Sequence, residues 1–285
     1  MILAVASGKG GTGKTTFSVN LARVFNAPVQ LLDCDVEEPN AHLFLNGTPL
    51  GNESVSISVP EVDESRCDGC GECGRFCRYK AIVAIKTSPL IFAELCHGCG
   101  GCAKICPRRA IREVPRPIGI VETSQSENIT LVQGRLNIGE TMAPPLIREV
   151  KKRLTKTMPA ILDAPPGTSC PVVATLRDVD FALLVTEPTP FGLNDLKLAV
   201  AMVRELGLPF GVAINRCGVG DQRVHEYCHG ETIPILAEIP DDRRIAEAYS
   251  RGRLIVDALP EYRDLLQNLW TEIGFMSAPF REAQP

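Results

Sequence analysis

Eight of the chain's twelve cysteines lie between positions 67 and 106 and repeat one spacing twice. The two runs are Cys67, Cys70, Cys73, Cys77 and Cys96, Cys99, Cys102, Cys106. Loops with two residues between thiolates can hold three corners of a cubane, and the fourth thiolate of each run then ligates the other cluster. We therefore expect one [4Fe-4S] cluster on Cys67, Cys70, Cys73 and Cys106. A second is expected on Cys96, Cys99, Cys102 and Cys77.

Zinc is the alternative, because Cys-x2-Cys pairs also build tetrahedral zinc sites. Two identical runs of four cysteines favour clusters over zinc, and the segment resembles bacterial two-cluster ferredoxins. One position departs from that pattern. Arg78 follows Cys77 where a proline is common, which adds a positive charge near the second cluster but removes no ligand.

A glycine-rich loop near the N-terminus matches the P-loop pattern in full. It reads Gly8, Lys9, Gly10, Gly11, Thr12, Gly13, Lys14, Thr15, and Thr16 follows it. Glycines let backbone N–H groups turn toward phosphate oxygens, and the start of the next helix adds partial positive charge. Lys14 is expected to reach the terminal phosphates and Thr15 to ligate Mg²⁺. ATP is the expected nucleotide, with GTP left open by the spacing.

The elements that position these residues alternate between strands and helices. Buried strands are predicted at 2–6, 29–32, 160–162, 181–185, 210–214 and 233–239, and helices at 15–25, 145–155, 192–206, 241–251 and 261–273. This alternation predicts an α/β fold with a mostly parallel sheet. A β-rich return is expected at 119–140, and the tail from Ser277 is expected to fray. The predicted domains are a P-loop domain at 1–57 and 119–285 and an inserted α+β ferredoxin-like domain at 58–118.

Lys9 is a second lysine at the start of the phosphate loop, and Asp163-Ala164-Pro165-Pro166-Gly167 follows an apolar strand. With these residues the chain resembles the MinD/Mrp/nitrogenase-iron-protein superfamily of deviant Walker A ATPases, of the SIMIBI type. The resemblance implies that Lys9 reaches the nucleotide of a dimer partner. It also implies an ATP-dependent homodimer, or a heterodimer with a sister ATPase.

The same resemblance assigns roles to further residues in chain order. Asp35 would position the attacking water, and Asp163 would support Mg²⁺. Gly167 would offer an N–H near the γ-phosphate. Asn215 and Pro240 would lie against the nucleotide base.

Bulk composition excludes some function classes. The net charge is −4 and aromatic residues make up 5% of the chain, which argues against a nucleic-acid partner. No signal peptide or membrane-spanning stretch is evident, and the segment 261–276 lacks the basic face of a membrane anchor. We expect a cytoplasmic protein, where cysteines hold metal more often than disulfides.

Three functions remain open at this point. The first is ATP-gated electron transfer through the two clusters to a redox partner. The second is metallocofactor assembly, with a metallocofactor acceptor protein as partner and Cys170 as the one candidate for a labile site. The third is a MinD-like positioning switch in which the clusters are structural. Because all eight cysteine ligands of a two-cluster ferredoxin are present, we favour stably bound redox clusters over clusters that are carried and released.

Overall fold

The computed structural model describes residues 1–85 and 88–282, which divide into two compact units. The sheet unit comprises Met1–Asn52, Val121–Arg135 and the chain from Ile147 onward. The cysteine unit comprises Glu53–Ile120 and Leu136–Leu146. The cysteine unit contains the segment predicted as the insertion, residues 58–118. It also contains residues 53–57, 119–120 and Leu136–Leu146.

One large sheet runs through the described residues in the order β11-β10-β9-β1-β8-β2-β7-β6-β3. Its strands are β1 (Ile2–Ala6), β2 (Val29–Asp33), β3 (Thr48–Val62), β6 (Ile111–Ser126), β7 (Ile129–Leu136), β8 (Ala160–Asp163), β9 (Phe181–Thr186), β10 (Phe210–Cys217) and β11 (Ile235–Pro240). All pairings from β11 through to β7 are parallel. The predicted fold class, α/β with a mostly parallel sheet, is confirmed.

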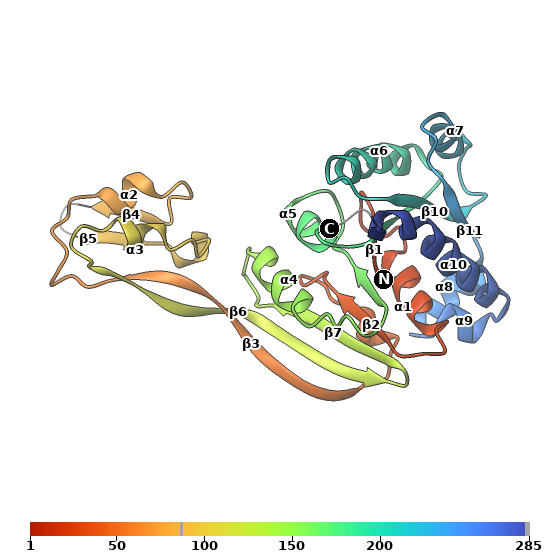
Figure 1. Cartoon of the computed structure of the whole chain (residues 1–285), viewed down its shortest axis with the longest axis horizontal. Coiled ribbons are helices and arrows are strands. Elements are labelled where there is room, and N and C mark those ends of the chain that lie inside the picture. The colour runs from red at the N-terminus through yellow and green to blue at the C-terminus, as the bar shows by residue number, and fades with distance from the viewer. Residues whose placement is uncertain (86–87, 283–285) are drawn as a thin grey trace. The chain divides into compact units, whose positions relative to one another are not determined.

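Helices cover both faces of the sheet, and Figure 1 shows α1 and α6 on opposite sides of it. The helices of the sheet unit are α1 (Lys14–Arg23), α4 (Ala143–Lys151, shared with the cysteine unit), α5 (Cys170–Leu176), α6 (Pro190–Glu205), α7 (Arg223–Gly230), α8 (Arg243–Ser250), α9 (Ile255–Ala258) and α10 (Glu261–Glu282). Alternate strand residues such as Leu3, Val5 and Leu183 form one core with Phe17 and Leu21 of α1. This period of two is what a strand buried between helix layers requires.

The cysteine unit is duplicated in its backbone as well as in its sequence, since residues 67–82 repeat as 96–111. It contains α2 (Glu72–Phe76), β4 (Ile82–Ile85), β5 (Ser88–Ile91) and α3 (Gly101–Ile105). Each short helix follows a left-handed glycine, Gly71 at φ 79° and Gly100 at φ 68°. Lys80 and Arg109, which occupy equivalent positions, also have positive φ values, 56° and 49°. The two halves therefore follow the same path.

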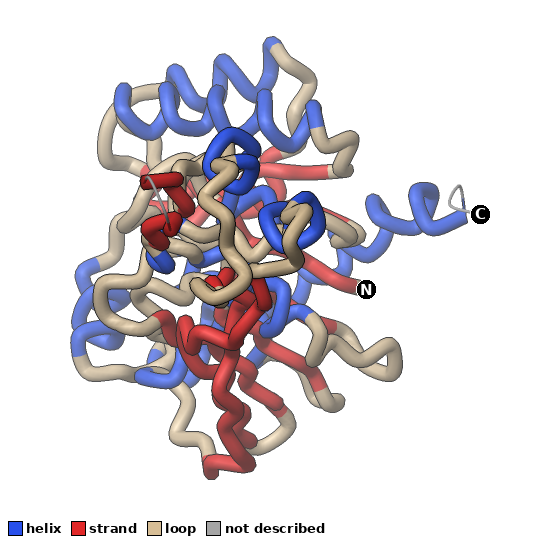
Figure 2. The backbone as a smooth tube through the Cα atoms, turned by 90° about the vertical axis from the view of Figure 1, so that its left-hand side faces the viewer, coloured by secondary structure: helices blue, strands red, loops and turns tan. Residues whose placement is uncertain are grey.

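Two segments differ from the expectations. The strand β3 was not predicted, because its first half is polar and exposed and only Val55, Ile57 and Val59 alternate inward. The helix α10 continues to Glu282 (Figure 2), so the frayed tail expected from Ser277 is wrong up to that residue. Residues 283–285 of that tail lie outside the described residues. None of the described helices combines the length and apolar character needed to cross a bilayer.

Candidate functional site

The phosphate loop turns from β1 into α1 through a left-handed glycine. Gly13 has a φ of 98°, and a Cβ there would lie 2.5 Å from the side-chain nitrogen of Asn215. That nitrogen donates a hydrogen bond to the Thr12 carbonyl at 2.9 Å. Gly8 is equally confined, since a Cβ would meet the Asp195 carbonyl oxygen at 2.1 Å. Asn215 and Asp195 therefore confine the loop on two sides. The N-terminus of α1, with its partial positive charge, can attract an anion.

Asp163, at the end of β8, accepts two hydroxyl hydrogen bonds from α1. Thr15 donates to its Oδ2 at 2.5 Å, and Ser18 donates to its Oδ1 at 3.0 Å. Burial raises the pKa of Asp163 to about 6, and these two hydrogen bonds and Lys14 oppose the rise. A hydroxyl and a carboxylate so placed suit Mg²⁺, which takes one or two protein ligands besides water and phosphate.

Two further aspartates lie at the carboxyl end of β2: Asp33 is its last residue, and Asp35 lies in the loop that follows. Asp33 is fully buried and accepts backbone N–H hydrogen bonds from Asp35, Asn40 and Ala41, which fixes the loop after the strand. Asp35 lies at the edge of the site, and burial, followed by the Asp163 carboxylate, raises its pKa to about 6. A carboxylate with a raised pKa in a nucleotide pocket is a candidate for positioning water.

Lys14 is almost fully buried among these carboxylates. Burial lowers the pKa of the Lys14 ammonium, and the nearby Asp163, Asp35 and Asp33 oppose this. A desolvated cation at the first residue of α1 is well placed to attract a phosphate.

Lys9 forms an ion pair that the sequence did not suggest. Its ammonium lies 3.0 Å from Oε2 of Glu187, whose other oxygen, Oε1, pairs with Arg216 at 2.9 Å. The Glu187 side chain is 9% exposed, so this carboxylate is largely enclosed by its two cations. The N–H of Gly167, which is expected near the γ-phosphate, donates to the Ser7 carbonyl at 3.0 Å.

A single pocket joins most of the predicted nucleotide residues. Those lining it are Gly10, Gly11, Gly13, Lys14, Thr15, Thr16, Asp35, Asn215 and Pro240, together with Asn40, Arg216 and Tyr249 among others. Gly8, Lys9, Thr12, Asp163 and Gly167 are not among the lining residues. The structure therefore places most of the residues predicted to contact the nucleotide around one pocket, while Lys9 is paired with Glu187.

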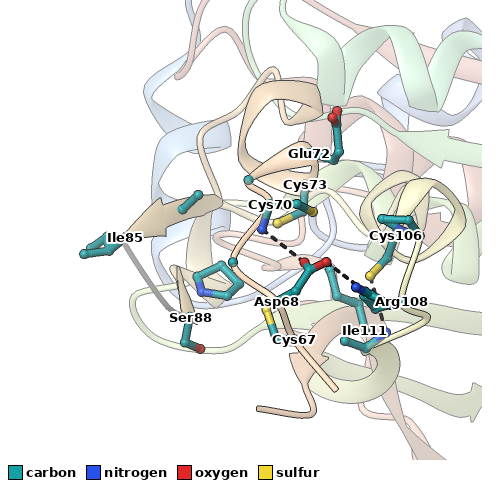
Figure 3. A pocket seen from close by; sticks show the side chains of 16 residues that line it. Cys67, Asp68, Cys70, Glu72, Cys73, Ile85, Ser88, Cys106, Arg108 and Ile111 are labelled. Atoms are coloured by element: carbon teal, nitrogen blue, oxygen red, sulfur yellow. Dashed lines mark hydrogen bonds and ion pairs between the residues drawn. The ribbon is translucent and has the colours of Figure 1, made fainter. Parts of the chain in front are cut away.

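The eight motif cysteines line two pockets of the cysteine unit, four at each. One pocket is lined by Cys67, Cys70, Cys73 and Cys106, and Figure 3 shows these side chains around it. The other is lined by Cys77, Cys96, Cys99 and Cys102. Each pocket thus takes three cysteines from one run and the fourth from the other. We call them the first pocket and the second pocket.

Four thiolates at each pocket are a ligand set that suits an iron–sulfur cluster. Within 1–85 and 88–282, no three His, Cys, Asp or Glu side chains converge closely enough to hold one metal ion. Zinc would need its sulfurs about 2.3 Å from the ion, whereas a four-iron cubane holds its thiolates farther apart. The N–H of Gly98 points to the Cys96 sulfur at 3.4 Å, and that of Ala110 to the Cys106 sulfur at 3.3 Å. Such hydrogen bonds are typical of iron–sulfur sites.

Sequence reasoning missed two contributors to the nucleotide site, namely Ser18 and Glu187. Ser18 could have been found, because residues three apart on a helix share a face and Thr15 was already assigned. The partner of Lys9 could not, because Glu187 lies 178 positions away in the chain. Cys170 is exposed at the start of α5.

The chain is similar to several known proteins in sequence and in fold. An uncharacterized protein of Methanocaldococcus jannaschii is 35% identical over 272 residues, covering 93% of each chain. A protein of Aquifex aeolicus named iron-sulfur cluster carrier protein is 25% identical over 283 residues, which is 91% of this chain and 63% of that protein. The solved structure of the septum site-determining protein MinD with Mg-ADP from Pyrococcus horikoshii shares the fold, with a TM-score of 0.58 at 22% identity over 95% of each chain. Residues 3–255 match the CobQ/CobB/MinD/ParA nucleotide binding domain, and the chain therefore belongs to that family.

Proposed function

We propose that this protein hydrolyses ATP and couples a nucleotide-dependent dimer to electron transfer through two [4Fe-4S] clusters. The observation that carries the proposal is the crossed arrangement of the cysteines, in which each pocket draws its fourth thiolate from the other run. This is the ligand pattern of two-cluster ferredoxins. It occurs in a chain whose other unit holds a nucleotide pocket.

Each nucleotide residue then has a defined task. Lys14 neutralises the terminal phosphates, while Thr15 and Asp163 hold Mg²⁺. Asp35 accepts a hydrogen bond from the attacking water and orients it. Lys9, once released from Glu187, reaches the nucleotide of a second subunit, either a copy of this chain or a sister ATPase. Clusters bound in the two pockets would store and pass single electrons.

Metallocofactor assembly is the second candidate, and a specific observation favours it. Several relatives, including those of Aquifex aeolicus and Pyrococcus abyssi, are named iron-sulfur cluster carrier protein. In that function the clusters would be transferred whole to an acceptor protein. The four thiolates at each pocket favour retention, because release would require all four iron–sulfur bonds to break.

An anaerobic acceptor assay separates the two. Protein reduced with dithionite is mixed, with and without Mg-ATP, either with a redox protein or with an apo-ferredoxin. Reoxidation with full retention of iron supports electron transfer. Movement of iron to the apo-protein supports assembly, and the absence of iron from anaerobically purified protein would overturn both.

A further inference from the structure

The duplication in the cysteine unit makes its two pockets comparable position by position. His97 occupies the place of Asp68, one residue after the first cysteine of its run. Tyr79 occupies the place of Arg108, two residues after the fourth cysteine. Because the runs are crossed, both members of each pair lie at one pocket: Asp68 and Arg108 at the first, and Tyr79 and His97 at the second.

The two pairs have opposite chemistry. At the first pocket, Arg108 donates to the Asp68 carboxylate at 2.8 Å, so the charges cancel (Figure 3). At the second pocket, the rings of Tyr79 and His97 stack with centroids 3.4 Å apart and an interplanar angle of 11°. Both rings are exposed, Tyr79 to 51%. The first pocket therefore has an ion pair at its rim, and the second pocket has an exposed aromatic surface at the equivalent position.

Apolar and positive side chains surround this stack. Phe76, on α2, also lines the second pocket and is 47% exposed. Arg78 lines the pocket. Lys80 follows Tyr79 in the chain and is exposed, but it is not a lining residue. Within the described part of the chain, neither cation forms an ion pair. Glu113 is the carboxylate at this rim, whereas Asp68 and Glu72 line the first pocket. A bound cluster would add the same charge at either pocket. The difference in charge between the two pockets therefore comes from the side chains at their rims.

We propose that the rim of the second pocket, with Phe76, Arg78, Tyr79 and His97, together with the adjoining exposed Lys80, is the docking surface for an acidic electron-transfer protein. Exposed aromatic residues with flanking cations are the composition of interface hot spots. Unpaired cations attract a partner whose redox centre is ringed by carboxylates and speed its encounter. The inference rests on the proposed function. Beyond that function, it specifies which of the two clusters passes the electron to the partner, and it specifies that the partner is acidic.

In the transfer, a reduced cluster held by the four cysteines of the second pocket would give up one electron, and its core charge would rise by one. The same electron reduces one ferric haem of the acceptor to ferrous haem. No proton moves, and no bond forms or breaks. Dithionite supplies the electron beforehand.

The test uses two haem proteins of opposite charge as probes, the acidic cytochrome b5 and the basic cytochrome c. Stopped-flow mixing of the reduced full-length protein with each gives the second-order rate constant at low and high salt. Lys80→Glu is expected to lower the rate constant with cytochrome b5 about tenfold at low salt, and high salt should erase the difference. With cytochrome c the same substitution should raise the rate constant.

Arg109→Glu is the matched control, because Arg109 is the duplicate of Lys80 with the same left-handed backbone. It should change neither rate constant more than about twofold. A second variant, Tyr79→Arg with His97→Asp, installs the ion pair of the first pocket at the second. It is expected to slow transfer to cytochrome b5 by about tenfold at unchanged iron content.

The outcomes separate this inference from the proposed function. If Lys80→Glu and Arg109→Glu slow transfer to cytochrome b5 equally, or neither does, the docking surface is wrong and electron transfer stands. If the larger effect comes from Arg109→Glu, the exit lies at the first pocket. If the iron-loaded wild-type protein reduces neither cytochrome, the proposed function fails as well.

Discussion

The ammonium of Lys9 lies 3.0 Å from the carboxylate of Glu187, in an ion pair closed within one chain. A lysine so engaged must exchange this partner before it can reach the nucleotide of another subunit. Glu187→Gln is therefore expected to strengthen ATP-dependent dimerisation about fivefold, since a partly exposed ion pair is worth on the order of 1 kcal/mol. Sedimentation equilibrium with a non-hydrolysable ATP analogue measures this. Glu231→Gln, which breaks the exposed pair with Arg204, is the control and should leave the dimer constant unchanged.

Ser18 supports Asp163 from the buried face of α1, and its removal should weaken Mg²⁺ binding. Ser18→Ala deletes the 3.0 Å hydrogen bond to Oδ1 of Asp163. Loss of such a supporting contact typically costs about tenfold in metal affinity. Titration of Mg²⁺ against a fluorescent nucleotide gives the affinity. Ser250→Ala, at an exposed serine whose hydroxyl donates to the Glu247 carbonyl, should bind Mg²⁺ as the wild type does.

Mg-nucleotide binding should release protons near pH 6. Burial raises the pKa of both Asp35 and Asp163 to about 6, so each carboxylate is partly protonated there. A bound cation favours the ionised carboxylates and lowers their pKa values, so protons are released on binding. At about pH 8 this proton release vanishes, because both carboxylates are already ionised before the cation binds. Calorimetry in buffers of different ionisation enthalpy counts the protons. Asp35→Asn should release fewer than the wild type, and an equal number would show that Asp35 does not titrate in this range.

Paired cysteine substitutions test the crossed ligand sets. Cys67→Ala with Cys106→Ala removes two ligands of the first pocket and should leave about four irons in the second. Cys67→Ala with Cys77→Ala removes one ligand from each pocket and should deplete both clusters. Iron analysis and electron paramagnetic resonance after anaerobic purification count them. Uncrossed runs would give the reverse result for the two double variants, and nucleotide binding should survive in both.

The phosphate loop contains a pair of glycines that differ in the space around them. A Cβ on Gly8 would lie 2.1 Å from a backbone oxygen of α6, whereas the nearest atom to a Cβ on Gly10 is 3.9 Å away on Pro166. Gly8→Ala should lower the free energy of unfolding by about 1–3 kcal/mol, because backbone must move to admit the methyl group. Gly10→Ala should unfold close to the wild type. Thermal unfolding of the nucleotide-free protein distinguishes them, and equal midpoints would contradict the crowding at Gly8.

The parts of this molecule that were predictable are those with a local signal. Strands such as β1 and β9 are continuous apolar runs, and the phosphate loop and the cysteine runs are defined by short spacings. The contacts that complete the sites are not local: Ser18 and Asp163 are 145 positions apart, and Lys9 and Glu187 are 178 apart. The hydrogen bond of Gly167 is also not local, because its N–H donates to the carbonyl of Ser7, which lies in a different loop. Nothing near these residues in the chain encodes the pairing.

The crossing of the cysteine runs also governs the order of events during synthesis. Cys67 emerges from the ribosome well before Cys106, yet both line the first pocket. With the proposed ligand sets, the second pocket is complete only when Cys102 has left the exit tunnel and the first only when Cys106 has, so neither cysteine run can complete a pocket by itself. Binding of the proposed clusters would therefore begin only after nearly the whole duplicated segment has been synthesised.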